Sequence, residues 1–194
     1  MKPYALLLAL LLSASAAQAA EDANAHLLAG ARAFRAQGYQ QSVVEFRVAL
    51  TLGAGPQARW YLAAALQKTG RTDEALAEFL RAEQEAPSSR DAVLTWYEAV
   101  ASHEARLYAR ADRLLSSIQR AGPKLQEQVR QLRTQLAPLL SAPATPGVLE
   151  WYLQRGRTRE PAAVAALYLE EARGLSARAT PDAGTPAVKG SMPQ

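Results

Sequence analysis

Few side chains in this sequence belong to the types that carry out acid–base or metal chemistry. His26 and His103 are the two histidines, and the 194 residues include no cysteine. Neither histidine stands at a metal-binding spacing from a second ligand. His103 and Glu104 fall near the expected end of a helix, where an imidazole is favoured by the terminal carbonyl groups. We therefore predict a solvated structural role for this pair, and neither a metal ion nor a cofactor.

Other motifs of catalysis are also missing from the sequence. It has no glycine-rich phosphate loop and no nucleophile elbow, and without cysteine it has no thiolate nucleophile. Asp73, Glu74, Glu83 and Glu85 fall on expected helix surfaces and first turns, where carboxylates solvate a helix and interact with its dipole. The sequence thus predicts a protein that is not an enzyme.

The first twenty residues differ from the rest of the chain. Lys2 precedes the apolar run 5–12, and small residues follow as far as Ala19. This is the layout of a secretory signal peptide, so we predict a signal peptide at 1–19 and a periplasmic or secreted mature protein. A retained membrane anchor is the alternative, but the run is shorter than the roughly 18 apolar residues of a spanning helix, and no second run follows.

The charge and the hydrophobic content narrow the classes of partner. The chain has 22 Lys and Arg against 18 Asp and Glu, a net charge of +4, and the basic residues are scattered. Nucleic-acid-binding domains concentrate such charge in a patch, so nucleic acid is not an expected partner. A hydrophobic fraction of 49% is enough for a buried core, which indicates a soluble globular protein.

The sequence repeats itself at a spacing close to that of one helical hairpin. Ser42, Phe46 and Ala49 recur 33 residues later as the second copy, at Ala75, Phe79 and Ala82. A third copy follows at a spacing of 36, in which the positions of Trp60, Ala63, Ala75, Phe79, Ala82 and Pro87 are taken by Trp96, Ala99, Ala111, Leu115, Ile118 and Pro123. Such a period indicates stacked helical hairpins, because one hairpin cannot bury its apolar face alone.

These residues resemble the tetratricopeptide repeat family. The second copy matches most of that family's signature, through Leu62, Ala63, Leu66, Gly70, Ala75, Phe79, Ala82 and Pro87. The third copy departs from it, with Glu98 and Ser102 at positions where leucine is usual and Arg106 where glycine is usual. The resemblance implies an all-α fold, a right-handed α-solenoid of stacked hairpins.

The resemblance and the hydrophobic pattern together divide the chain. We expect repeats and one capping helix over 20–141, with the cap carried by the apolar positions of 125–139. Pro-rich residues then lead to a C-terminal helix pair over 147–176. Residues 177–194 combine Pro and Gly with no apolar period and predict a disordered tail.

In tetratricopeptide proteins the first helix of each hairpin lines a concave groove. By this resemblance the partner-binding residues are Leu27, Phe34, Arg35, Trp60, Gln67, Lys68, Trp96, Val100 and His103. Trp60 and Trp96 stand at equivalent positions and would form an apolar strip that anchors a partner. The alternative is that both tryptophans are buried between helices.

The predicted function is that of an exported protein-interaction scaffold or adaptor, in the bacterial cell envelope, that binds a partner peptide or helix in its groove. One alternative is a structural protein in which helices 147–176 pack against another copy. A less favoured alternative is an enzyme that cleaves cell-wall glycan, because such enzymes need a separate catalytic domain and the repeats leave no room for one.

Overall fold

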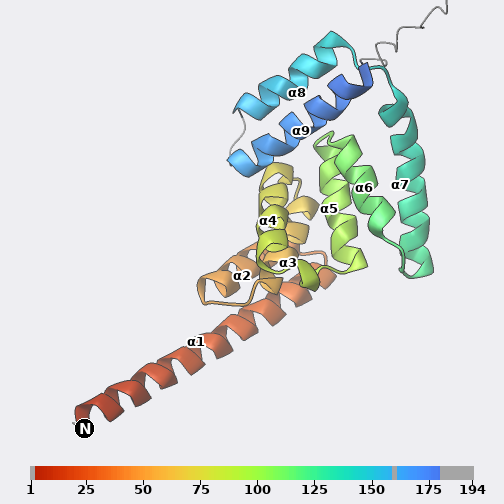
Figure 1. Ribbon diagram of the computed structural model, residues 1–194. Coiled ribbons are helices and arrows are strands. Elements are labelled where there is room, and N and C mark those ends of the chain that lie inside the picture. Colours follow the sequence, from red (N-terminus) through yellow and green to blue (C-terminus); the bar gives the residue numbers. More distant parts are fainter. Residues whose placement is uncertain (1–2, 159–160, 180–194) are drawn as a thin grey trace, which may run out of the picture.

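The computed structural model describes residues 3–158 and 161–179, and in these residues all regular structure is helical (Figure 1). The predicted all-α class is therefore confirmed. The helices are α1 (Pro3–Arg35), α2 (Tyr39–Thr51), α3 (Gln57–Lys68), α4 (Thr72–Glu85), a short 3₁₀ turn η1 (Pro87–Ser89), α5 (Ala92–Glu104), α6 (Tyr108–Ser117), α7 (Pro123–Ser141), α8 (Pro146–Thr158) and α9 (Ala162–Ala179).

Helices that follow one another in the chain pack side by side. α1 pairs with α2, α3 with α4, and α5 with α6, while α3 also contacts α2 and α5. α7 packs on α6. The hairpin of α8 and α9 then turns back, so that α9 lies across the ends of α4 and α6 (Figure 1).

The turns inside the first three hairpins have the same backbone geometry. Gln37, Gly70 and Arg106 adopt positive φ angles of 63°, 74° and 64°, at the spacings of 33 and 36 seen in the sequence. The next N–H in each turn donates to the carbonyl oxygen five residues earlier, at 2.9, 3.0 and 2.8 Å, in the pairs Gly38–Ala33, Arg71–Leu66 and Leu107–Ser102. This is the hydrogen bond of a Schellman cap. Arg106 thus keeps the conformation that glycine takes in the preceding repeat.

Small and large side chains alternate where the helices meet. Ala63, Ala75 and Ala82 are fully buried, and the Trp60 and Phe79 rings lie 6.0 Å apart among them. The same device operates in the first hairpin. A Cβ on Gly30 would come within 2.7 Å of the Phe46 ring, and the Ser42 hydroxyl donates to the Gly30 carbonyl at 3.0 Å. The core therefore depends on close helix contact, as expected for an alanine-rich sequence.

Two element boundaries differ from the sequence-based expectation. α1 is continuous from Pro3 to Arg35, so it passes through the expected cleavage point after Ala19. A continuous helix does not test cleavage, and the signal peptide stays a prediction. α9 continues to Ala179, three residues past the expected end of the helix pair, because Ala177, Arg178 and Ala179 still support helix. The rest of the expected tail, 180–194, lies outside the described residues. In the part of the chain that the structure describes, no helix is both long and apolar enough to cross a membrane.

Candidate partner-binding groove

A row of aromatic rings joins the first hairpin to the third. The Phe34 ring, at the end of α1, meets the Tyr39 ring at the start of α2 edge to face, with centroids 5.2 Å apart. On its other side it meets the Tyr97 ring of α5 at 5.6 Å and an interplanar angle of 85°. Aromatic pairs favour this arrangement, because the positive edge of one ring faces the negative face of the other. The row therefore fixes α1, α2 and α5 relative to one another.

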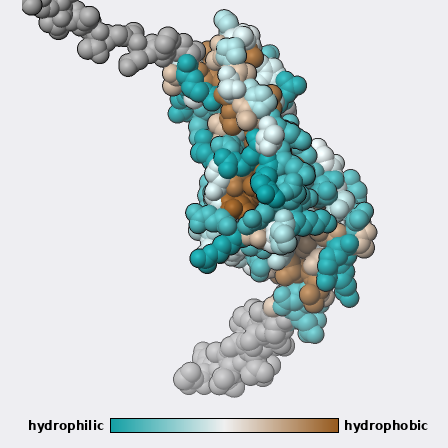
Figure 2. Space-filling view, turned by 90° about the vertical axis from the view of Figure 1, so that its right-hand side faces the viewer, coloured by the Kyte–Doolittle hydropathy of each residue, from teal (hydrophilic) through white to brown (hydrophobic). Residues whose placement is uncertain are grey.

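A hollow of about 560 Å³ lies beside this row, between α3, α5 and the start of α7. We call it the groove. It is lined by Lys68, Val93, Trp96, Tyr97, Gly122, Pro123, Lys124, Leu125 and Gln128. Figure 2 views the molecule from the side that carries α7, and there hydrophilic side chains surround smaller apolar areas. An apolar hollow framed by polar side chains is the usual form of a site for another molecule.

The groove has a positive electrostatic bias. Lys68 and Lys124 are the charged residues in its lining, and both are exposed. The Lys68 ammonium lies 5.3 Å from the centre of the Tyr39 ring, a cation–π distance. Burial raises the pKa of the Tyr97 hydroxyl, and the neighbouring Tyr39 adds to this. The hydroxyl therefore stays protonated at neutral pH, and Tyr97 adds no negative charge to the groove.

The structure brings several of the predicted residues together. Lys68 and Trp96 line the groove, and Phe34 adjoins it through Tyr97. Arg35 is exposed at the end of α1, where its Nε donates to the Ala31 carbonyl at 3.4 Å.

Sequence reasoning missed the other residues of the groove lining, among them Val93, Tyr97 and Lys124. A signal for two of them was present, because Val93, Trp96, Tyr97 and Val100 are spaced three or four residues apart and so share one side of α5. Lys124 comes from α7, which the repeat pattern does not place against α5.

Other predicted residues have different surroundings. Trp60 is fully buried, and its indole N–H donates to the Ala86 carbonyl at 3.2 Å. The alternative of a buried tryptophan thus describes this position, and Trp60 cannot anchor a partner without leaving the core. The reason is its place opposite the small residues of α4, where a large ring is needed to fill the space.

The remaining predicted residues pack mainly inside the protein. Gln67 is 7% exposed and donates to Glu104 at 2.9 Å. Leu27 and Val100 are half-buried against the two apolar clusters of the core. The His103 ring lies 5.9 Å from that of Tyr108.

The most buried charged cluster surrounds Glu98 of α5. Its carboxylate is fully buried and accepts hydrogen bonds from Arg90 at 3.1 Å and Arg110 at 2.5 Å. Burial raises the pKa of Glu98, while the two guanidinium groups act in the opposite direction. Glu83 of α4 pairs with the same two arginines, at 3.3 and 3.6 Å. The cluster ties α4, α5 and α6 together, which gives the buried carboxylate of Glu98 a structural role.

One of the two histidines forms a pair with a carboxylate. His26 Nδ1 lies 2.7 Å from Glu45 Oε2, and this hydrogen bond lowers the pKa of Glu45. Across residues 3–158 and 161–179, no three His, Asp or Glu side chains are grouped so that they could hold a metal ion. Comparison with protein-family models, with curated proteins and with solved structures finds no match to this chain.

Proposed function

We propose that this chain is an exported interaction scaffold or adaptor of the tetratricopeptide type, active in the bacterial cell envelope. Its three hairpins would stack as a right-handed solenoid, with the groove on the concave side. The repeated turn geometry at Gln37, Gly70 and Arg106 supports the equivalence of the hairpins on which this proposal rests. The partner is a protein segment, either a helix or an extended peptide.

The observation that carries the proposal is the groove itself. Trp96 and Val93 offer apolar surface, and Val93 is 49% exposed. A large apolar side chain of the partner would lie against them and release water from both surfaces. Lys68 and Lys124 stand at either side without a carboxylate in the lining, so an acidic residue of the partner would set its orientation.

Photo-crosslinking from a single position tests this directly. A benzophenone amino acid is placed at Val93, and in a matched control at Val44, which is 53% exposed on α2 away from the groove. We expect a discrete adduct from position 93 in cells and none from position 44. Equal capture from both positions would mean that the chain has no preferred binding face there.

Affinity measurements on the captured partner then separate the contributions. Trp96→Ala should weaken binding by at least roughly tenfold, since truncated aromatic anchors often cost 2 kcal/mol or more. Lys124→Glu changes only an exposed side chain and should also weaken binding. The difference in affinity from the wild type should shrink as the salt concentration rises, because salt screens exposed charges. Val44→Ala is the control and should bind as the wild type does. Wild-type affinity in both groove variants would refute the proposal.

Self-association is a second candidate, favoured by one observation. Leu28 of α1 and Val44 of α2 are 61% and 53% exposed, so the first hairpin shows apolar side chains on its surface. A second copy could cover them. Sedimentation of the mature chain at micromolar concentration tests this, and a monomer unaffected by Leu28→Glu would exclude it.

A further inference from the structure

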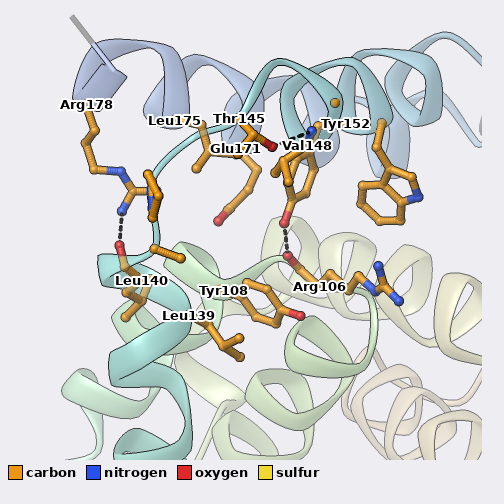
Figure 3. Close-up of a pocket in the computed structure, with 14 residues that line it drawn as sticks. Arg106, Tyr108, Leu139, Leu140, Thr145, Val148, Tyr152, Glu171, Leu175 and Arg178 are labelled. Atoms are coloured by element: carbon orange, nitrogen blue, oxygen red, sulfur yellow. Dashed lines mark hydrogen bonds between the residues drawn. The ribbon is translucent and has the colours of Figure 1, made fainter.

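A second hollow, of about 500 Å³, lies where the α7–α8 link meets α9 and the start of α6 (Figure 3). We call it the junction pocket. It is lined by Arg106, Tyr108, Leu139, Leu140, Ala142, Pro143, Thr145, Gly147, Val148, Trp151, Tyr152, Glu171, Leu175 and Arg178. It shares no lining residue with the groove. Its volume falls within the range of about 300–1,000 Å³ that is typical of small-molecule sites.

Most of the wall of the junction pocket is apolar. Leu140 of α7, Val148 of α8 and Leu175 of α9 face it from three helices. Leu139 and Val148 are 40% and 43% exposed, so the chain leaves aliphatic side chains in water at this place. A ligand with a hydrocarbon portion would cover them and gain roughly 25 cal/mol for each Å² removed from water.

The charged groups in the lining of the junction pocket are two arginines and one carboxylate. Arg178 donates from Nη1 to the Leu140 carbonyl at 3.3 Å, and the Arg106 guanidinium lies 5.3 Å from the centre of the Trp151 ring (Figure 3). Both arginines are exposed. A guanidinium carries five N–H donors, so each can also bind an oxyanion.

Glu171 is the one acidic residue in the lining, and it is engaged within the protein. It is 6% exposed, and its Oε1 accepts the Ala109 N–H at 2.8 Å, at the start of α6. Burial raises the pKa of Glu171, whereas the N–H groups at the start of α6 and the charges of Arg113 and Arg178 favour its charged form. Arg106 and Arg178 outnumber this one buried carboxylate in the lining, so the pocket keeps a positive bias.

We propose that the junction pocket binds an amphipathic anion with a single aliphatic chain, of the fatty-acid class. The chain lies among Leu139, Leu140, Val148 and Leu175, and the carboxylate pairs with Arg178, which lies beside Leu140 (Figure 3). Arginine suits this role because its planar fork can bind both oxygens of a carboxylate. This site is independent of the groove and of any protein partner.

Calorimetric titration with dodecanoate, below its micelle concentration, tests the proposal on the full chain. Dodecanol is the matched neutral ligand. We expect saturable binding of one dodecanoate, at least tenfold tighter than that of dodecanol. The proposal is wrong if dodecanoate does not saturate, or if both compounds bind equally, since Arg178 would then contribute nothing.

Two pairs of variants place the ligand. Val148→Trp fills the junction pocket, whereas Val93→Trp makes the same change at an equally exposed valine in the groove. We expect at least a tenfold loss of dodecanoate affinity in the first and none in the second. Equal losses in both would refute the proposed location.

The second pair tests the charge and alters only exposed side chains, so folding is preserved. Arg178→Gln should weaken dodecanoate binding at least fivefold and leave dodecanol unchanged. Arg113→Gln removes the same charge from α6 outside the pocket lining, where the side chain is 57% exposed and pairs with Glu170. It should bind as the wild type does. Unchanged affinity in Arg178→Gln would overturn the assignment of the carboxylate.

Discussion

The contact between α3 and α4 and the docking of α9 onto α4 and α6 are built from different kinds of side chain. The α3–α4 contact is mainly apolar, and small and large side chains alternate in it. Ala63, Ala75 and Ala82 are fully buried there, with the Trp60 and Phe79 rings between them. Its cohesion comes chiefly from close packing and hydrophobic burial, and Arg59 of α3 adds ion pairs with Glu78 and Glu85 of α4 at the edge of the contact.

The docking of the α8–α9 hairpin adds specific hydrogen bonds to an apolar contact. Tyr168 is 1% exposed, and its hydroxyl donates to Asp73 at 3.4 Å. Glu171 accepts the Ala109 N–H, and the Tyr152 hydroxyl donates to the Arg106 carbonyl. These bonds join residues 95, 62 and 46 positions apart in the chain. The comparison teaches that one molecule uses repeated packing within its hairpins and single long-range polar bonds where a hairpin is added.

The largest expected effect concerns the packed contact. Phe79→Ala removes a fully buried ring and leaves a cavity beside Trp60, so we expect the free energy of unfolding to fall by about 3–5 kcal/mol. Urea denaturation followed by circular dichroism measures this. Val44→Ala, at a 53% exposed position, should change it by less than about 0.5 kcal/mol. A loss for Phe79→Ala no larger than that for the docking residues would remove the contrast between the two regions.

The sequence predicts the packed contact well, because the information is local and repeated. Ala75, Phe79 and Ala82 follow the helical period, and Gly70 marks the end of α3. Arg106 is instructive, since its residue type disagrees with the family pattern while its φ of 64° matches that of Gly70 at 74°. The spacing of the repeat was therefore a better guide to the backbone than the residue type. The C-terminal helix pair and the capping helix could also be predicted from the sequence, because their apolar residues recur at a clear helical spacing.

The sequence could not predict the docking of α9, nor most of the groove. Nothing in the hydrophobic pattern of α9 indicates that Glu171 reaches the start of α6, 62 residues earlier. Lys124 likewise reaches the groove from α7. Trp60 and Trp96 occupy equivalent positions, yet one is fully buried and the other half-buried. Trp60 has another hairpin on each side, whereas Trp96 lies beside α7, a single helix.

The second prediction concerns the carboxylate that links α9 to α6. Glu171→Ala leaves the Ala109 N–H buried without its acceptor, so we expect a loss of about 1–3 kcal/mol. Glu171→Gln keeps an oxygen that can accept this hydrogen bond. It replaces a carboxyl group whose pKa burial raises, so the loss of unfolding free energy should be smaller than in Glu171→Ala. Hydrogen exchange of the first turn of α6 gives a local readout.

The neighbouring residue provides the control for this measurement. Glu170 is 54% exposed and pairs with Arg113 at 2.8 Å, so Glu170→Ala should cost at most about 1 kcal/mol. Equal protection of α6 in Glu171→Ala and Glu170→Ala would show that the link between the helices does not depend on the buried carboxylate.

The smallest effect isolates one hydroxyl of the docking contact. Burial raises the pKa of Tyr152, whose hydroxyl therefore stays protonated and donates to the Arg106 carbonyl in the left-handed turn after α5. Tyr152→Phe keeps the ring and removes this bond, so we expect a loss of about 0.5–1.5 kcal/mol. Tyr61→Phe is the matched control, because the Tyr61 hydroxyl accepts a hydrogen bond from the Gln57 amide at 3.2 Å on the surface. Removing this hydroxyl should cost less unfolding free energy than Tyr152→Phe does. Thermal and urea unfolding of both variants make the comparison. If the two losses are equal, the bond from Tyr152 contributes no more than a surface contact, and the docking of the α8–α9 hairpin does not depend on it.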